Sequence, residues 1–383
     1  MFGPSSEAHL PWRIRLRLMR RRWEHRGRNL LLALLRWFLG KGPGTEKAPG
    51  GLEPGNGNSV VQRILIIRTG KPLGDAVMSL ALASGCRKLF PNARVDFLLR
   101  DNISPLFLEG AGIDHVLEWH PRVWKWPADT VRMFRALRGN RYDLAIACDN
   151  PFKSSFTTLF FTLLTGARHR VGFENEESRV FLNLPVAPVR DQHTVFNLMR
   201  LLTPFGETAS LSLPRLIPSG DAAKEADRLL GPDCKLIMIF APNHWRKSWP
   251  LEPFVRLSTE FTRRKFHVLL AFGPGDDRTN HPIVCQWIKQ SNGLGRVLPP
   301  QKLTVLAAIL QRCGLFVAND CGPYHLAVSV GTPCVAAFRI GEGQREFGYE
   351  EPNRLVTVYH PVLEEAERLT LEASLRLLEV HRA

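Results

Sequence analysis

Short apolar runs bounded by charged residues recur along the body of the chain. In the run at 63–68, four apolar residues stand between two arginines, as in a parallel strand that is covered on both faces. Similar runs predict strands at 94–99, 143–148 and 171–173, and apolar residues at helical spacing predict helices at 76–89 and 131–137. This alternation of strand and helix is typical of a doubly wound α/β domain.

The same alternation begins again after a Pro- and Ser-rich stretch at 210–221. Strands are predicted at 236–240, 267–272, 315–318 and 334–338, and a last helix at 363–380 is free to pack on either half. A chain of 383 residues also exceeds what one hydrophobic core usually organises. We therefore expect two Rossmann-like domains, 59–215 and 216–383, that face a central cleft and bind ligands at the carboxyl ends of their strands.

Residues 1–58 have a different pattern. Nine arginines with interleaved tryptophans lie between residues 10 and 39, and the apolar run of about ten residues that holds the last of them is too short to span a bilayer. We expect residues 10–39 to lie on an anionic membrane surface and 40–58, rich in Gly and Pro, to be a flexible linker. A basic tail without structure, or a mis-assigned start codon, is the alternative.

The formal net charge of +15 changes little in this picture. Eleven Lys and Arg against three Glu lie within the first 50 residues, so the leader carries +8 of the total, and no nucleic-acid-binding motif is present. We therefore expect no nucleic-acid partner. The seven cysteines are scattered without CxxC spacing, which is typical of reduced thiols rather than of a zinc site or a disulfide framework.

The segment at 315–327 carries the clearest chemistry, because a strand runs through a polar turn into a helix start. Asp320 or Cys321 is placed to cap the helix, and Pro323 suits its first turn. Free amides and the helix dipole at such an end favour a phosphate, and His325 can add a donor or a positive charge. Asp320 is better explained by hydroxyl groups, so the segment predicts a sugar phosphate as ligand.

Three further strand ends carry candidate residues. The turn after the first strand delivers Asp75 to a helix start, where simple helix capping is the alternative to a catalytic role. The loop after 236–240 holds Arg246 and Lys247, which are either cations for a diphosphate or solvated charges. The turn at 272–277 ends in two acids, which either bind ribose or sugar hydroxyls or belong to an ordinary turn.

Taken in order, these segments resemble glycosyltransferase family 9, the bacterial ADP-heptose:lipopolysaccharide heptosyltransferases and their relatives. The similarity covers about residues 62–360. Two departures stand out: the loop 69–74 is one residue longer than is usual and holds Lys71-Pro72, and Cys321 replaces a Thr. The segments that carry the resemblance are Gly74-Asp75, Lys153-Ser154, Lys247-Ser248-Trp249-Pro250, the Gly-Pro-Gly-Asp turn at 273–276 and the Asn-Asp-Cys-Gly-Pro-Tyr-His-Leu-Ala segment at 319–327.

The resemblance implies a GT-B fold and an inverting, metal-independent transfer that needs no cofactor. Asp75 would be the general base for the acceptor hydroxyl, and Lys247 would meet the leaving diphosphate. The implied partners are a nucleotide-sugar donor, ADP-heptose in the first instance, and a lipopolysaccharide core or other lipid-linked glycan as acceptor. The residues implied to contact the donor are Gly74, Asp276, Asp320, Cys321, Gly322 and His325, and those implied to face the acceptor are Lys153 and Ser154.

Two alternatives remain open on the sequence. The first is a transferase of the same fold that uses another nucleotide sugar for O-antigen, capsule or protein glycosylation. The second is a non-catalytic, membrane-associated scaffold that binds anions. With the basic leader, the resemblance implies a cytoplasmic protein that is peripheral on the inner face of the inner membrane.

Overall fold

The computed structural model describes residues 61–108, 112–124, 126–206, 210, 212–231, 236–244 and 246–381. The leader and linker predicted at 1–58 lie outside these ranges, so the membrane-surface prediction stays a prediction. Within them, no helix is both long enough and apolar enough to cross a membrane.

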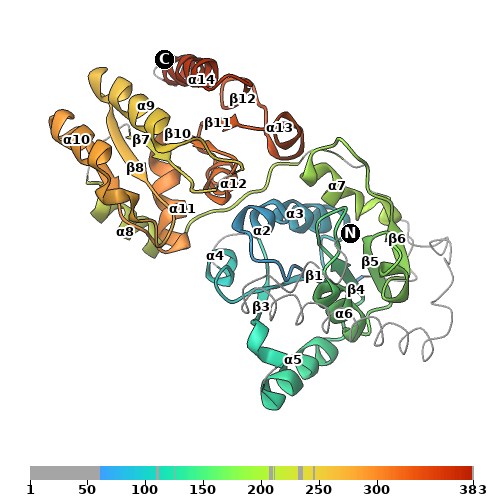
Figure 1. The fold of residues 1–383 in the computed structure, drawn as a ribbon. Coiled ribbons are helices and arrows are strands. Elements are labelled where there is room, and N and C mark those ends of the chain that lie inside the picture. The colour runs from blue at the N-terminus through green and yellow to red at the C-terminus, as the bar shows by residue number, and fades with distance from the viewer. Residues whose placement is uncertain are drawn as a thin grey trace, which may run out of the picture.

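Two six-stranded parallel sheets form the centres of the two halves (Figure 1). The first has the order β3-β2-β1-β4-β5-β6, and the second has the equivalent order β12-β11-β10-β7-β8-β9. The chain therefore repeats one doubly wound topology twice, as expected. The strands of the first sheet are β1 (Arg63–Ile67), β2 (Arg94–Arg100), β3 (His115–Trp119), β4 (Leu144–Ala147), β5 (His169–Phe173) and β6 (Leu184–Val186); those of the second are β7 (Leu236–Phe240), β8 (His267–Ala271), β9 (Gly295–Leu298), β10 (Cys313–Asn319), β11 (Cys334–Phe338) and β12 (Leu355–Tyr359).

Helices cover both faces of each sheet, because successive residues of a buried strand point to opposite sides. In β1, Ile64 and Ile66 face one core, whereas Leu65 and Ile67 face another that α5 and α6 complete. In β7, Ile237 packs with α9, α10 and α14. The helices are α2 (Leu73–Met78), α3 (Leu80–Leu89), α4 (Ser104–Leu108), α5 (Pro127–Gly139), α6 (Phe156–Leu164), α7 (Thr194–Arg200), α8 (Gly220–Leu230), α9 (Leu251–Arg263), α10 (Pro282–Gln290), α11 (Leu303–Arg312), α12 (Gly322–Ser329), α13 (Gly341–Phe347) and α14 (Leu363–Val380).

The two halves meet through α2 and α12, which pack against each other at the centre of the molecule (Figure 1). One hydrophobic cluster runs without interruption from the first sheet through these helices to α8 and α11 of the second. The helix predicted at 363–380 is α14, which packs only on elements of the second half among its principal contacts. The two halves thus share one hydrophobic core at their junction.

The predicted helix at 76–89 is wrong in one respect, since the chain forms two helices there. Ser79 separates α2 from α3, and its hydroxyl donates to the carbonyl of Ala76 (2.5 Å). A serine that bonds back to its own helix competes with the regular ladder and bends it. The first turn of α2 lies against α12 of the second half.

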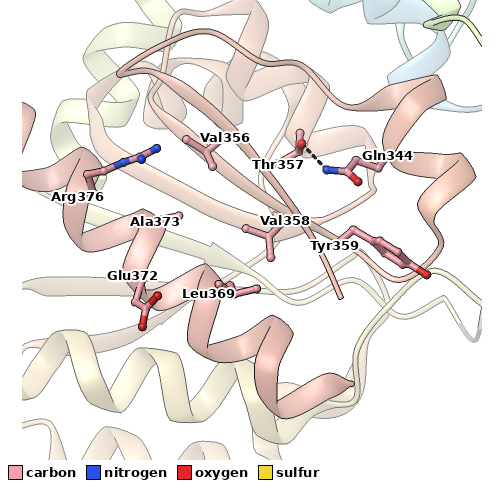
Figure 2. A pocket seen from close by; sticks show the side chains of 9 residues that line it. All are labelled: Gln344, Val356, Thr357, Val358, Tyr359, Leu369, Glu372, Ala373 and Arg376. Atoms are coloured by element: carbon pink, nitrogen blue, oxygen red, sulfur yellow. Dashed lines mark hydrogen bonds between the residues drawn. The ribbon is translucent and has the colours of Figure 1, made fainter. Parts of the chain in front are cut away.

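A hollow of about 530 Å³ lies at the outer edge of the second sheet, between β12, α13 and α14. Figure 2 shows Val356, Val358 and Leu369 on its walls and Gln344 turned toward the hydroxyl of Thr357, to which it donates (2.8 Å). None of the residues predicted for the site lines this hollow. Gly74 and His325, two of the predicted site residues, lie instead where the two halves meet.

Candidate active site between the two domains

The strand–turn–helix junction at 315–327 is present as predicted. β10 ends at Asn319, Cys321 is the N-cap of α12, and Pro323 lies in the first turn. The Cys321 side chain makes no capping hydrogen bond, and burial raises the pKa of its thiol, so the sulfur stays neutral. The amino end of α12 is thus formed by backbone groups, as an anion site requires.

Asn319 links β10 to β11 and to the loop that follows β7. Its buried side chain accepts from the Trp249 N–H (2.8 Å) and donates to the Ala337 carbonyl (2.8 Å). These bonds fasten the loop that follows β7 and the end of β11 to β10. The loop residue Lys247 is thereby held beside Asp320.

Lys247 and Asp320 form an ion pair at the amino end of α12. The Lys247 Nζ lies 2.6 Å from Asp320 Oδ2 and 4.9 Å from the ring centre of Phe347. Asp320 is largely buried, whereas Lys247 is 42% exposed and open to a ligand. The arrangement offers a cation and a carboxylate side by side, which suits a phosphate attached to a polyhydroxy group.

His325 is buried at the junction, and it does not carry the positive charge that the sequence allowed. Burial, assisted by the nearby Lys247 ammonium, lowers its pKa to about 3, so the imidazole is neutral at physiological pH. Its Nδ1 lies 3.4 Å from the Tyr349 hydroxyl, and its Nε2 lies 3.9 Å from Asp320 Oδ1. His325 can act only as a neutral donor or acceptor and as packing.

Asp75 lies on the facing helix, in the first turn of α2. The N-cap of α2 is Pro72, so the alternative in which Asp75 merely caps the helix is wrong. Its carboxylate is paired with the guanidinium of Arg68, at 2.5 Å from Nη2 to Oδ2, and remains 31% exposed. A carboxylate that is oriented by an arginine yet open to the cleft can take a proton from a ligand.

Gly74 brings the two helices into contact. A Cβ at this position would lie 2.5 Å from Cδ2 of His325, and a Cβ at Gly322 would lie 2.9 Å from the Cβ of Leu73. The two glycines therefore allow the amino ends of α2 and α12 to meet. Their role here is close approach, which the sequence did not distinguish from contact with a donor.

Asp149 was missed on the sequence, although it directly follows a predicted strand. It accepts hydrogen bonds from the Ser155 N–H (2.8 Å) and the Thr158 hydroxyl (2.9 Å). Burial raises its pKa to about 6, against the opposing charge of Arg68. Because β4 is the neighbour of β1, Asp149 and Asp75 follow adjacent strands at the same edge of the sheet.

Lys153 and Ser154 lie between β4 and α6, at the same edge as Asp75. Lys153 is exposed, and the Ser154 hydroxyl accepts from the Asn175 side-chain amide (2.5 Å). The structure thus places both residues where the first domain borders the cleft. Their contact with an acceptor stays a prediction.

Asp276 is engaged by its own turn. Arg278 holds both of its carboxylate oxygens (Nε to Oδ1, 2.9 Å; Nη2 to Oδ2, 2.5 Å) and lowers its pKa, while the side chain is 4% exposed. Arg278 also donates to the Ala241 carbonyl (2.7 Å). This geometry favours the alternative that the sequence left open, an acid that stabilises an ordinary turn.

A cavity of about 250 Å³ lies between the halves, at the carboxyl ends of β7, β8 and β9. Apolar residues from these ends and from the loop that follows β9 form its walls, and Lys71 and Asn102 reach it from the first domain. No local sequence motif predicts this cavity, because the cavity exists only where the two domains meet. Largely apolar walls with a few polar groups are typical of small-molecule sites.

The chain is similar to known glycosyltransferases. Residues 130–370 match the profile of glycosyltransferase family 9 (heptosyltransferase). The chain is 22% identical over 278 residues to lipopolysaccharide heptosyltransferase 3 of Escherichia coli K12, covering 69% of this chain and 79% of the relative. It is also 22% identical over 289 residues to lipopolysaccharide heptosyltransferase 1 of Pseudomonas aeruginosa, covering 72% and 78%.

Solved structures with the same fold include a family 9 glycosyltransferase from Veillonella parvula, with a TM-score of 0.68 at 18% identity over 84% of this chain and 98% of that one. The E. coli ADP-heptose lipopolysaccharide heptosyltransferase II superposes with a TM-score of 0.66 at 20% identity, covering 84% of this chain and all of that one. Together with the two facing parallel sheets, these similarities identify the architecture as GT-B. The chain belongs to glycosyltransferase family 9, the heptosyltransferase family, and is a glycosyltransferase.

Proposed function

We propose that this enzyme transfers a heptose from ADP-heptose to a lipopolysaccharide core or a related lipid-linked glycan, with inversion and without a metal. The curated relatives are named for heptosyl transfer to lipopolysaccharide or lipooligosaccharide. A structure of the same fold, E. coli WaaC, contains ADP-2-deoxy-2-fluoro heptose. ADP-heptose is therefore the first donor to test.

The donor is proposed to lie along the second domain. Its diphosphate meets Lys247 and the amino end of α12, and hydroxyls of the sugar meet Asp320. The adenine of the donor enters the 250 Å³ cavity, where Gln301 donates through Nε2 to the Pro299 carbonyl (2.9 Å). That bond leaves Oε1 of Gln301 as an acceptor, which suits the exocyclic amine of adenine.

Transfer then requires a base on the other side of the sugar. Asp75 takes the proton of the acceptor hydroxyl while the oxygen of that hydroxyl attacks the anomeric carbon of the donor. The bond from the anomeric carbon to the diphosphate breaks. Attack from the face opposite the leaving group inverts the anomeric configuration. Lys247 and the amides of α12 stabilise the charge that develops on the diphosphate.

The observation that carries this proposal is the contact between the amino ends of α2 and α12. It places the helix of the carboxylate Asp75 directly against the helix that begins beside Lys247 and Asp320. A base and a leaving-group site on separate domains, facing one gap, is the arrangement that in-line displacement needs.

Donor binding tests the first half of the proposal. Calorimetry with ADP, UDP, GDP and CDP should show selective binding of ADP. Asp320→Ala should weaken the binding of ADP-heptose more than the binding of ADP. Transfer is measured as ADP release from ADP-heptose with lipopolysaccharide that lacks its heptoses. If the protein prefers another nucleotide and transfers sugar from the corresponding nucleotide sugar, that nucleotide sugar and not ADP-heptose is the donor.

The role of Asp75 is tested by Asp75→Asn, which keeps the shape of the side chain. We expect kcat to fall by about 10² to 10⁴ while ADP-heptose affinity stays near the wild-type value. Asp129→Asn on α5 is the matched control, because Asp129 is equally exposed and also pairs with an arginine. Near-full activity in Asp75→Asn would remove the base role.

A further inference from the structure

Arg68 is buried beneath the Asp75 carboxylate and is connected to two strands. Its Nη2 binds Asp75 Oδ2 (2.5 Å), its Nη1 donates to the Cys148 carbonyl (2.9 Å), and its side chain is 7% exposed. It directly follows β1, while Cys148 directly follows β4. The guanidinium is therefore fixed by the sheet edge and in turn fixes Asp75.

Asp149 directly follows Cys148, whose carbonyl accepts from Arg68, and it is held by a separate set of donors. In addition to Ser155, the hydroxyl of Thr158 binds its carboxylate, and the Thr158 hydroxyl also lies 2.7 Å from that of Thr69, the residue after Arg68. Both Asp149 and Thr158 are buried. A second carboxylate is thus built rigidly into the network under the catalytic cleft.

We propose that Arg68 and Asp149 are positioning residues for Asp75: Arg68 orients the carboxylate, and the negative charge of Asp149 offsets the charge of Arg68 so that Asp75 can accept a proton. This inference depends on the proposed role of Asp75 as general base. It assigns to this chain a paired-carboxylate device in which one acid reacts and the other tunes it.

The charges around Asp149 are few, which makes the sign of the effect clear. The groups that act on it are Arg68, Asp75, the Ser155 amide and the Thr158 hydroxyl, while burial raises the pKa of the adjacent Cys148 thiol to about 12 and keeps it neutral. When the pH falls through about 6, Asp149 gains a proton. The positive charge of Arg68 is then no longer offset by the negative charge of Asp149, so Arg68 attracts the Asp75 carboxylate more strongly. Proton transfer to Asp75 therefore becomes slower.

The experiment is a pH profile of kcat at saturating ADP-heptose and heptose-deficient lipopolysaccharide. The wild type should lose activity as the pH falls through about 6. Asp149→Asn should lower kcat at neutral pH roughly threefold to thirtyfold with little change in KM, and should abolish this limb. Thr158→Val keeps the charge but removes a stabilising donor, so the limb should move to higher pH.

Asp96→Asn is the matched control. Asp96 is a buried carboxylate of the same domain, bound to the Tyr142 hydroxyl (2.8 Å) and to Arg94 (2.7 Å) on β2. Its loss should lower stability without moving the pH limb. An unchanged limb in Asp149→Asn, or the same change in Asp96→Asn, would overturn the proposal.

A second readout does not depend on activity. Carboxyl carbon NMR of Asp-labelled full-length protein should show one buried aspartate that titrates near pH 6, and Asp75→Asn should shift that titration to lower pH because a neighbouring negative charge is lost. No shift would overturn the coupling. If the shift is present but no heptose is transferred, the network stands and the proposed function fails.

Discussion

At the scale of single residues, the site depends on side chains whose charge state is decided by burial and pairing. His325 is neutral because it is buried, and Asp149 titrates near pH 6 for the same reason. Asp276 is held ionised by Arg278. Residue type alone did not predict these differences, because a pKa follows from the surroundings of the group.

Replacing Lys247 tests the leaving-group site. Lys247→Gln should lower kcat by about 10² to 10³, since a charge that acts on the developing diphosphate is removed. Stability should change little, because the lysine is partly exposed. Lys224→Gln, which removes another lysine paired with an aspartate on the surface, is the control and should retain full activity.

Gly74→Ala tests the close approach of the two helices. The new methyl group would meet the ring of His325, so we expect a stability loss of about 1–3 kcal/mol together with reduced kcat. Gly139→Ala, where a Cβ meets nothing within 4 Å, is the control. Equal thermal midpoints and rates for the two variants would show that the junction does not depend on Gly74.

At the scale of elements, the loop after β7 and the amino end of α12 act as one unit because Asn319 joins them. Asn319→Ala leaves the Trp249 N–H and the Ala337 carbonyl without their partner, which should cost about 2–4 kcal/mol for two buried groups. Lys247 would lose its fixed position, so kcat of the folded enzyme should also fall.

Asn183 provides the comparison for this prediction. Its side chain likewise makes two backbone hydrogen bonds, to the Arg170 N–H (2.7 Å) and the Arg168 carbonyl (2.7 Å), but between strands of the first sheet. Asn183→Ala should therefore lower the free energy of unfolding and leave kcat of the folded fraction unchanged. A normal kcat in Asn319→Ala would show that Asn319 does not hold Lys247 in position.

At the scale of the whole molecule, two buried histidines lie where the halves meet. His193 caps α7, and its ring lies 4.6 Å from that of Tyr349 between centres. Burial and the proximity of His325 lower its pKa to about 4. Both rings are neutral in the folded protein, so the joint between the domains is an apolar and aromatic contact.

This joint should weaken in acid. Since both folded pKa values lie below the usual 6.5, the unfolded chain binds more protons between about pH 6.5 and 4, and stability falls as the pH drops through that window. The raised pKa of Asp149 acts in the opposite direction between about 6 and 4, but it is one group against two. Denaturation midpoints at pH 7.5, 6 and 5 measure the slope, which should be shallower in His193→Gln.

The leader belongs to this scale as well. Removing residues 1–50 should abolish binding to liposomes that contain anionic lipid while donor binding by the body is preserved. Unchanged liposome binding in the truncated protein would defeat the anchor and with it the peripheral inner-membrane placement that the sequence predicts.

The sequence by itself determined the central strands, the twofold repeat of the doubly wound pattern and the strand–turn–helix at 315–327. These features depend on local apolar runs and helix-start residues, which act over a few positions. The strands that escaped prediction, β3, β6, β9 and β12, are the two edge strands of each sheet, where weaker burial leaves a less continuous apolar pattern. The family resemblance rested on the same local segments.

Only the tertiary structure decided how the candidate groups are used. It paired Lys247 with Asp320 across 73 positions, made His325 neutral, and linked Asp149 through Thr158 to Thr69, the residue after Arg68. It also created the cavity between the domains. Charge pairing, burial and cavities depend on which distant segments meet, and no local pattern in the sequence contains that information.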